Sequence, residues 1–428
     1  MTRIILFCLC ILIQLPALSQ ETYTALRCGA LIDVDKGKVL ENVIVLIEGT
    51  RIKEVGPTVK IPEGATVVDL SNATVLPGMI DLHCHILGSP DFDMGGSAAA
   101  KALTGVKNAE VVLLSGFTTI RDPGSGAPGY AGVALRDALG KGWFPGPRMF
   151  VAGRFLSITG GHGDNNNVAP EEETRGDNIV NGPDEMRVAV RRDLKFGCDW
   201  IKLYATGGFF SAGDDPRQQH FSDEEMMVAV QEATRLGKFV SAHAHGSEGI
   251  KAAVRAGIRT IEHGTFIDDE GIGLMKEHGT FLVPTLRTIE ELRKEPPADA
   301  SEGWMKAYQL ANKHFSSMMV NVGKAMKGGV KTAFGSDMIT LPHGLAAQGL
   351  RLHVQAGQSP IEAIRSATIV SAEALDIHGT TGSIAPGKFA DIIAVEGDLL
   401  KDVTVLEKVG FVMKEGKIYK QAIGTTGR

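Results

Sequence analysis

The sequence predicts an α/β fold: a TIM-like (β/α)₈ barrel with a small β-sandwich formed by both ends of the chain. The middle of the chain alternates short β-rich segments with helical patterns. Both ends carry short alternating β patterns with glycine turns. The 428 residues, 43% of them hydrophobic, suffice for one large core and an accessory domain. We therefore expect sandwich parts at 20–75 and 379–428 around a barrel at 76–378.

The first 19 residues have the composition of a secretory signal peptide. Arg3 precedes an apolar run at 4–13, and Ala17 and Ser19 offer small residues at signal-peptidase spacing. The apolar run is too short to form a stable membrane anchor. We therefore expect cleavage near Ser19 or Gln20 and a secreted or periplasmic mature chain.

Charge and cysteine content limit the classes of partner. The net charge of −6, from 50 acidic and 44 basic residues, gives no indication of a nucleic-acid partner. Removal of the signal peptide leaves Cys28, Cys84 and Cys198, too few for a disulfide framework. We interpret all three as small core residues, with one disulfide as the alternative in an oxidising compartment. The composition leaves open whether the chain forms a homo-oligomer.

Eight β-rich segments alternate with helical patterns in the middle of the chain. The first, at 75–86, contains the pair His83-x-His85. The other seven are 118–122, 148–152, 200–204, 239–243, 260–263, 281–285 and 332–337. Helix starts are marked at Pro183, by a capping signature at 222–225, and at Ser359, whose helix we expect to reach Leu375.

Polar side chains occupy the ends of these segments, where such barrels place their chemistry. His83 and His85 share one face because side chains alternate across a strand, and two such imidazoles can hold one metal ion. The further strand-end candidates are Asp122, Lys202, His243, His263 and Asp337. Each alone has an ordinary structural role open to it, such as a helix N-cap for Asp337. The combination indicates a metal centre.

The chain resembles the amidohydrolase superfamily, in its branch of metal-dependent, prolidase-like dipeptidases and imidazolonepropionase-like proteins. The matching stretches are LPGMIDLHCH at 76–85, GGHGD at 160–164, IKLYATGG at 201–208, AHAHG at 242–246, IEHG at 261–264, GSD at 335–337 and GSIAPGKFAD at 382–391. The resemblance covers essentially the whole mature chain.

This resemblance implies a site for two divalent metal ions. The implied ligands are His83, His85 and Asp337 for the buried ion, and His243 and His263 for the more exposed one. Lys202 would bridge both ions as an N-carboxylated lysine formed with CO₂, an anion that two adjacent cations favour. Imidazole and carboxylate ligands suit Zn²⁺ best, with Mn²⁺ or Co²⁺ as alternatives.

The resemblance further implies an enzyme that cuts the amide bond of a dipeptide or an N-acyl amino acid, using a hydroxide that bridges the two metals. Asp337 would take the hydroxide proton and pass it to the leaving amine. His162, in the loop after the third strand, would stabilise the oxyanion or contact the substrate, with an ordinary loop histidine as the alternative. Further substrate contacts are expected at His245, at His343 and at Tyr204, for which a core residue is the alternative.

Two other functions stay open at this point. A cyclic-amide hydrolase of the imidazolonepropionase type is the alternative enzyme, but one metal and no carboxylated lysine are expected there, so Lys202 argues against it. A non-catalytic binding protein on the same barrel would have no need of the complete ligand set. The loops at 165–182 and 290–302 are expected to cover the site.

Overall fold

The structure is a computed structural model that describes residues 23–88, 96–124, 128–211, 213–338 and 342–427. The predicted signal peptide at 1–19 and its cleavage site lie outside these residues. In the described ranges, no helix has the length and apolar character needed to cross a membrane.

Seven parallel strands form a curled sheet in which neighbours in space are also neighbours in sequence. They are β5 (Met79–Asp81), β6 (Phe117–Asp122), β7 (Arg148–Leu156), β8 (Trp200–Tyr204), β9 (Phe239–Ala244), β10 (Thr260–His263) and β11 (Phe281–Val283). Apart from β7, which is only partly buried along much of its length, the residues of these strands are almost entirely buried on both faces, as parallel strands covered by helices require. The predicted TIM-like barrel is confirmed.

The eighth predicted strand, 332–337, closes this sheet as an extended segment with few ladder bonds. Thr332 makes a parallel bridge to Leu282 of β11. On the other side, the backbone N–H of Asp337 donates to the carbonyl of His83 over 2.6 Å. The segment leaves extended geometry at Asp337, where φ is 55°. It therefore joins β11 to the end of β5 without forming a regular strand.

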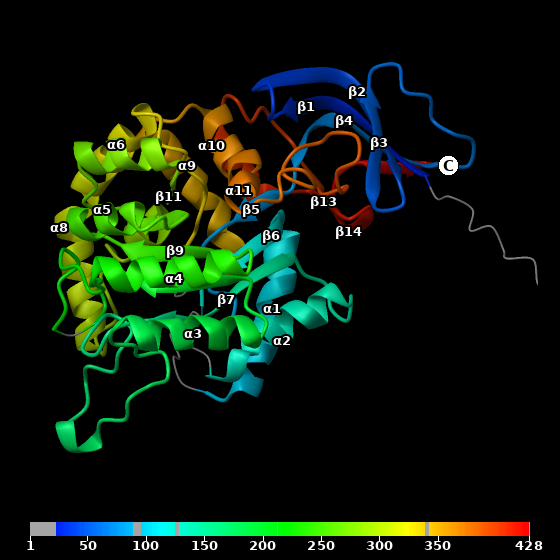
Figure 1. Ribbon diagram of the computed structural model, residues 1–428. Helices are drawn as coiled ribbons and strands as arrows, with labels where there is room; N and C mark the ends of the chain where they lie inside the picture. The colour runs from blue at the N-terminus through cyan, green and yellow to red at the C-terminus, as the bar shows by residue number, and fades with distance from the viewer. Residues whose placement is uncertain (1–22, 89–95, 125–127, 212, 339–341, 428) are drawn as a thin grey trace, which may run out of the picture.

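Helices cover the outside of the barrel (Figure 1). The α-helices are α1 (Ala98–Leu114), α2 (Ala131–Gly140), α3 (Pro183–Lys195), α4 (Asp223–Arg235), α5 (Ser247–Arg255), α6 (Asp269–His278), α7 (Leu286–Glu291), α8 (Glu302–Lys327), α9 (Gly349–Ala356), α10 (Pro360–Ser366) and α11 (Ile369–Ala374). Short 3₁₀ helices are η1 (Pro128–Tyr130), η2 (Pro170–Glu172), η3 (His343–Gln348) and η4 (Val403–Lys408).

Two predicted helices had different outcomes. The capping box expected at 222–225 is present at the start of α4. The single helix expected over 359–375 is wrong, because the chain breaks into α10 and α11 at Thr368, where φ is −134°. At the break, the carbonyl of Ala367 accepts a 2.7 Å hydrogen bond from the N–H of Ile80 in β5. A contact to the barrel thus replaces one helical turn.

Both chain ends join in one eight-stranded sheet beside the barrel, at the upper right of Figure 1. Its strands are β1 (Tyr23–Asp33), β2 (Lys38–Glu48), β3 (Arg51–Gly56), β4 (Thr66–Pro77), β12 (Ile392–Val395), β13 (Phe411–Lys414), β14 (Lys417–Gln421) and β15 (Thr425–Gly427). β4 pairs in parallel with β1 and antiparallel with β12 and β15. The prediction that the two ends form one small β domain is confirmed.

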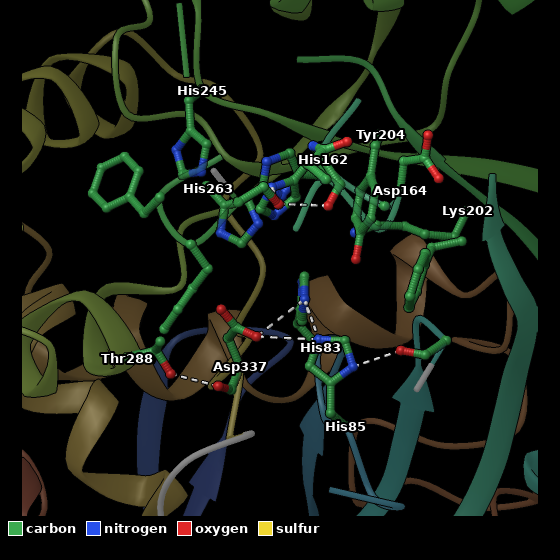
Figure 2. Close-up of a pocket in the computed structure, with 18 of the residues that line it drawn as sticks. His83, His85, His162, Asp164, Lys202, Tyr204, His245, His263, Thr288 and Asp337 are labelled. Carbon is green, nitrogen blue, oxygen red and sulfur yellow. Dashed lines mark hydrogen bonds and ion pairs between the residues drawn. The ribbon is translucent and has the colours of Figure 1, made fainter. Parts of the chain in front are cut away.

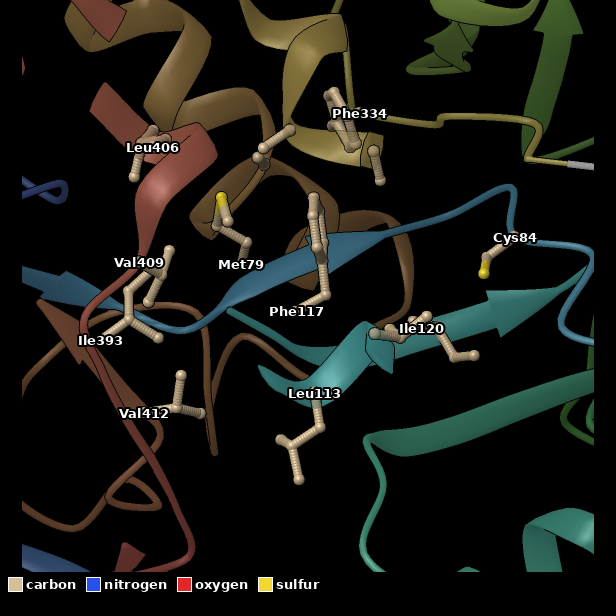
Figure 3. Close-up of a cluster of buried hydrophobic side chains, with 14 of the residues drawn as sticks. Met79, Cys84, Leu113, Phe117, Ile120, Phe334, Ile393, Leu406, Val409 and Val412 are labelled. Atoms are coloured by element: carbon tan, nitrogen blue, oxygen red, sulfur yellow. The ribbon is translucent and has the colours of Figure 1, made fainter. Parts of the chain in front are cut away.

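The small sheet and the barrel share a hydrophobic core. β4 leads into β5 after a single residue, and Met79 and Phe117 of the barrel belong to the same buried cluster as Ile393 and Val412 of the C-terminal strands (Figure 3). These contacts involve the first residues of β5 and β6. The carboxyl ends of the barrel strands, where a site is expected, lie at the opposite end of the strands.

The three cysteines of the described chain are buried free thiols: Cys28, Cys84 and Cys198. Cys84 packs in the hydrophobic cluster outside the barrel sheet, so its side chain turns away from the two histidines that flank it. The structure therefore supports the interpretation of these cysteines as core residues, because none of the three forms a disulfide.

Candidate active site

Three of the predicted ligands converge where β5 ends. The Nε2 atoms of His83 and His85 lie 3.2 Å apart, and Asp337 Oδ1 lies 3.4 Å and 3.2 Å from them (Figure 2). Ligand atoms about 2 Å from a tetrahedral ion are roughly 3.3 Å apart, so this spacing fits a single divalent ion. The sequence suggested that the strand ends in these two histidines. In the structure the strand ends before them, and they follow it in a bend.

A second group of imidazoles adjoins the first. The ring centroids of His243 and His263 are 4.5 Å apart, and His245 lies 4.6 Å from both. The candidate ligand atoms of these three histidines all lie within 4.8 Å of one another, as do those of His83, His263 and Asp337. His263 therefore belongs to both groups. His245, predicted as a substrate contact, is close enough to be a ligand.

Lys202 is buried in β8 beside both groups, and its Nζ has no hydrogen-bond partner among the described residues. Burial lowers the pKa of its amine to about 8. A buried amine without a partner is costly, and its neutral form is the one that reacts with CO₂. A carboxylated lysine between two cations would satisfy this group, so the residues present fit the implied metal pair.

Each imidazole of the ligand set has one ring nitrogen bonded away from the cavity, which leaves the other for a metal. The pairs are His83 Nδ1 with Glu262 at 2.8 Å, His85 Nδ1 with the Gly124 carbonyl at 2.6 Å, His263 Nδ1 with the Thr285 hydroxyl at 2.6 Å, and His243 Nε2 with the Gly207 carbonyl at 3.1 Å. Gly124 is in turn held by Asp122, whose carboxylate accepts its N–H. The strand-end candidate Asp122 thus helps to orient His85 by holding Gly124 in place.

A buried ion pair supports His83. Arg121 donates to one oxygen of Glu262 over 2.6 Å, and the other oxygen accepts from His83. Burial alone would raise the pKa of Glu262, but the Arg121 charge and the His83 hydrogen bond hold it well below its usual range. Neither residue was predicted from the sequence. The sequence signal available for Arg121 was a charged side chain inside the buried strand at 117–122.

The protonation states suit metal binding. Burial lowers the pKa of His83 to about 4 and that of His245 to about 3, and it brings that of His263 well below its usual range. At neutral pH these imidazoles are therefore neutral, the form that binds a metal. Burial acts the same way on His85, but its hydrogen bond to Asp337 dominates and raises its pKa.

Two candidate ligands have left-handed backbone conformations. φ is 72° at His263 and 55° at Asp337. Such conformations cost a non-glycine residue on the order of 1–3 kcal/mol and persist where the surroundings enforce them. Here the strained residues direct an imidazole and a carboxylate from the strand ends into the cavity.

A cavity of about 520 Å³ opens over both ligand groups, a size that suits a small molecule. The apolar part of the lining consists of Phe155, Tyr204, Phe209, Phe210, Ile289 and Leu292. Polar lining comes from His162, Asp164, Asn165, Asn166, Asn167, Ser211 and Thr288. The two loops predicted to cover the site each contribute the residues at their near ends.

The remaining predicted substrate contacts lie in different places. His162 and Tyr204 line the cavity, and the His162 ring stacks on His243 with centroids 4.6 Å apart. His343 is absent from the cavity lining formed by the described residues. Its Nε2 donates to the carbonyl of His85 over 3.1 Å, so it braces the backbone of a candidate ligand, and the expectation of a substrate contact there gains no support.

The barrel and its paired ligand groups define a hydrolase of the amidohydrolase family. The family model, Amidohydrolase family, matches residues 74–419, and the chain belongs to this family. The chain is 34% identical to ochratoxinase of Aspergillus niger, over 93% of this chain and 86% of that protein. A Xaa-Pro dipeptidase structure with bound methionine superimposes with a TM-score of 0.87 at 35% identity, covering 93% of this chain and 100% of that one.

A prolidase structure complexed with N-methylphosphonate-L-proline is also similar. It has a TM-score of 0.84 and 31% identity, and the match covers 94% of this chain and 100% of that one. The predicted relationship to prolidase-like amidohydrolases is confirmed. The chain is therefore an enzyme of a family that acts on small-molecule amides and peptides.

Proposed function

We propose that this enzyme uses two metal ions to hydrolyse the amide bond of a dipeptide or an N-acyl amino acid. The observation that carries the proposal is the buried Nζ of Lys202, which has no partner in the described part of the chain and lies beside two groups of candidate metal ligands. A carboxylated Lys202 would offer one oxygen to each ion. Zn²⁺ fits the imidazole and carboxylate set best. The relatives with dipeptidase and prolidase in their names support the same substrate class.

The bound metal pair would activate a water molecule and polarise the scissile carbonyl. Asp337 would then act as the general base and acid. Burial raises the pKa of Asp337, but the neighbouring His83 and His85 lower it overall, so the carboxylate is ionised. Its side chain is 13% exposed and faces the cavity, where it can accept a proton and return it to the leaving amine.

The cavity walls indicate how a substrate would bind. Phe155, Phe209 and Phe210 offer an apolar surface for a side chain or acyl group, and the amides at 165–167 face the same space. His162 lines the same cavity and stacks on His243, a position from which it can contact the scissile carbonyl. A substrate with an apolar group and a polar end matches this division.

We also propose that the mature enzyme is secreted or periplasmic. The proposal depends on the signal-peptide composition of residues 1–19. Amino-terminal sequencing of the exported protein tests it, with an expected start near Ser19 or Gln20. An uncleaved chain retained in the cytoplasm would contradict it.

The enzymatic proposal is tested by removing and restoring the metal. Chelator-treated protein is assayed on dipeptides, N-acyl amino acids and a cyclic amide, with and without Zn²⁺ and bicarbonate. We expect no activity without metal and hydrolysis of linear amides that saturates near two equivalents of Zn²⁺. Activity that is the same with and without metal, or that is confined to the cyclic amide, would overturn the proposal. Zn²⁺ binding without any hydrolysis would favour a binding protein.

A further inference from the structure

A network of polar and charged side chains contacts Nδ1 of His162. His162 Nδ1 lies 3.2 Å from Asp214 Oδ2 and 2.8 Å from the Ser211 hydroxyl oxygen. The Ser211 hydroxyl donates its own proton to the carbonyl of His162 over 2.7 Å, so its oxygen can accept from Nδ1. The Asp214 side chain is only 2% exposed. A buried carboxylate is thus directed at one nitrogen of a ring that lines the cavity.

Helix α8 holds this carboxylate from the other side. Lys306 donates to Asp214 Oδ1 over 3.2 Å and to the Asp214 carbonyl over 2.6 Å, and it also bonds the carbonyl of Ser211. The N–H of Gly208 donates to Oδ2 over 3.0 Å. Burial alone would raise the pKa of Asp214, but the His162 hydrogen bond and these donors lower it. The carboxylate is therefore charged and fixed in place.

Gly208 provides space for the His162 ring. A Cβ atom at position 208 would lie 2.1 Å from Cε1 and 2.4 Å from Nε2 of the imidazole. Gly208 is not among the glycines with positive φ, so backbone conformation does not require a glycine here. The close approach of the ring does. The loop after β8 is thus shaped around His162.

With Nδ1 directed at Asp214 and Ser211, Nε2 is the nitrogen of His162 that remains for the cavity. We propose that Asp214 and Lys306 are positioning residues, which hold the His162 ring so that Nε2 meets the scissile carbonyl of the substrate. The role of His162 at the carbonyl depends on the proposed function, whereas the ring orientation can be measured without it. This hydrogen-bonded network joins three segments: the loop after β7 with His162, the loop after β8 with Asp214, and α8 with Lys306.

Kinetics of single and double variants test the catalytic part. We expect His162→Ala and Asp214→Asn each to lower kcat by about 10- to 100-fold with little change in KM. The double variant should be no worse than His162→Ala alone, because Asp214 acts only through the imidazole. The kcat of Lys306→Met should lie between that of the wild type and that of Asp214→Asn. Losses that multiply in the double variant would overturn the proposal.

A matched control separates this effect from a general loss of stability. Asp193 is another buried carboxylate, which accepts a 2.7 Å hydrogen bond from Tyr130 and is not among the described residues that line the cavity. Asp193→Asn should leave kcat and metal content unchanged. If it lowers kcat as much as Asp214→Asn does, removal of any buried carboxylate is sufficient and the positioning role is wrong.

The ring orientation is measured directly in ¹⁵N-histidine-labelled protein, with the His162 signals assigned by their loss in His162→Ala. We expect the proton on Nδ1 in the wild type. In the double variant Asp214→Leu/Ser211→Ala neither acceptor remains at Nδ1, so the proton should move toward Nε2. An unchanged Nδ1 proton would overturn the positioning role even if the enzyme is active. A shift without any amide hydrolysis would support the orientation and contradict the proposed function.

Discussion

At the scale of single residues, Glu262 decides which nitrogen of His83 faces the metal site. Its carboxylate accepts from Nδ1 and is neutralised by Arg121. Glu262→Gln removes the charge partner of a fully buried guanidinium and weakens the orientation of the ligand. We expect a 10- to 100-fold loss of metal affinity and a loss of stability of about 3 kcal/mol. Chelator competition and denaturant unfolding measure the two effects.

The control for this variant is Glu232→Gln. Glu232 pairs with three arginines of α3 and α4 and is not among the described residues that line the cavity. It should lose stability without losing metal affinity. If both variants bind the metal as the wild type does, the hydrogen bond from His83 to Glu262 has no role in holding the ion.

The sequence pointed to the candidate metal ligands and to Asp122 behind His85, but not to Glu262 and Arg121, which support His83. Histidines and a carboxylate that recur at successive strand ends, each within a matching motif, seldom occur together outside a metal site. Glu262 and Arg121 are 141 residues apart in the chain, and no local pattern pairs them. Asp214 and Lys306 are 92 residues apart and lie in segments that look like ordinary polar loop and helix. Such partners become visible only when the fold brings them together.

At the scale of elements, local signals were reliable where local contacts decide the structure. The capping box at 222–225 is satisfied by its own residues, and α4 begins there. The helix expected over 359–375 ends early because the Ala367 carbonyl bonds to Ile80 of β5. That bond depends on a strand almost 300 residues earlier, so a helical pattern could not predict it. The irregular closing segment at 332–337 has the same kind of cause.

The loop after β8 gives a prediction at this scale. Gly208→Ala should displace the His162 ring, because the added Cβ would lie 2.1 Å from it. We expect a loss of kcat of at least tenfold in a folded, metal-loaded enzyme. Gly273, inside α6 with open space at its Cβ position, is the matched control. Gly273→Ala should keep full activity and gain about 0.5–1 kcal/mol of stability. Equal activity in the two variants would contradict the role given to Gly208.

At the scale of the whole molecule, the buried histidines make stability depend on pH. Burial lowers the pKa of His83, His343 and His353 to about 4 and that of His245 to about 3. Unfolding returns each to about 6.5, so the unfolded chain binds more protons between these values. The metal-free protein should therefore keep this stability above pH 6.5 and lose it as the pH falls toward 4. The slope is at most about 1.4 kcal/mol per pH unit for each histidine.

Two carboxyl groups whose pKa is raised by burial, Asp81 and Asp193, oppose this effect. Burial raises the pKa of Asp81 to about 7, so the folded state binds its proton more readily, and this group adds stability as the pH falls. Denaturant unfolding of metal-free protein at pH 7.5, 6.5, 5.5 and 4.5 measures the net result. His353→Gln, outside the cavity, should reduce the slope by the share of one histidine. Stability that is constant or higher toward acid would contradict the prediction.

The measurement that most directly tests the two-metal site is the metal content of wild type and Lys202→Ala, each loaded with Zn²⁺ and bicarbonate. We expect close to two ions per wild-type chain, and at most one ion and no amide hydrolysis in the variant, because the bridging anion is lost. Addition of a short carboxylic acid to the variant should restore part of both. A wild type with one ion, or a Lys202→Ala variant that keeps two ions and its activity, would contradict the bridging role of Lys202.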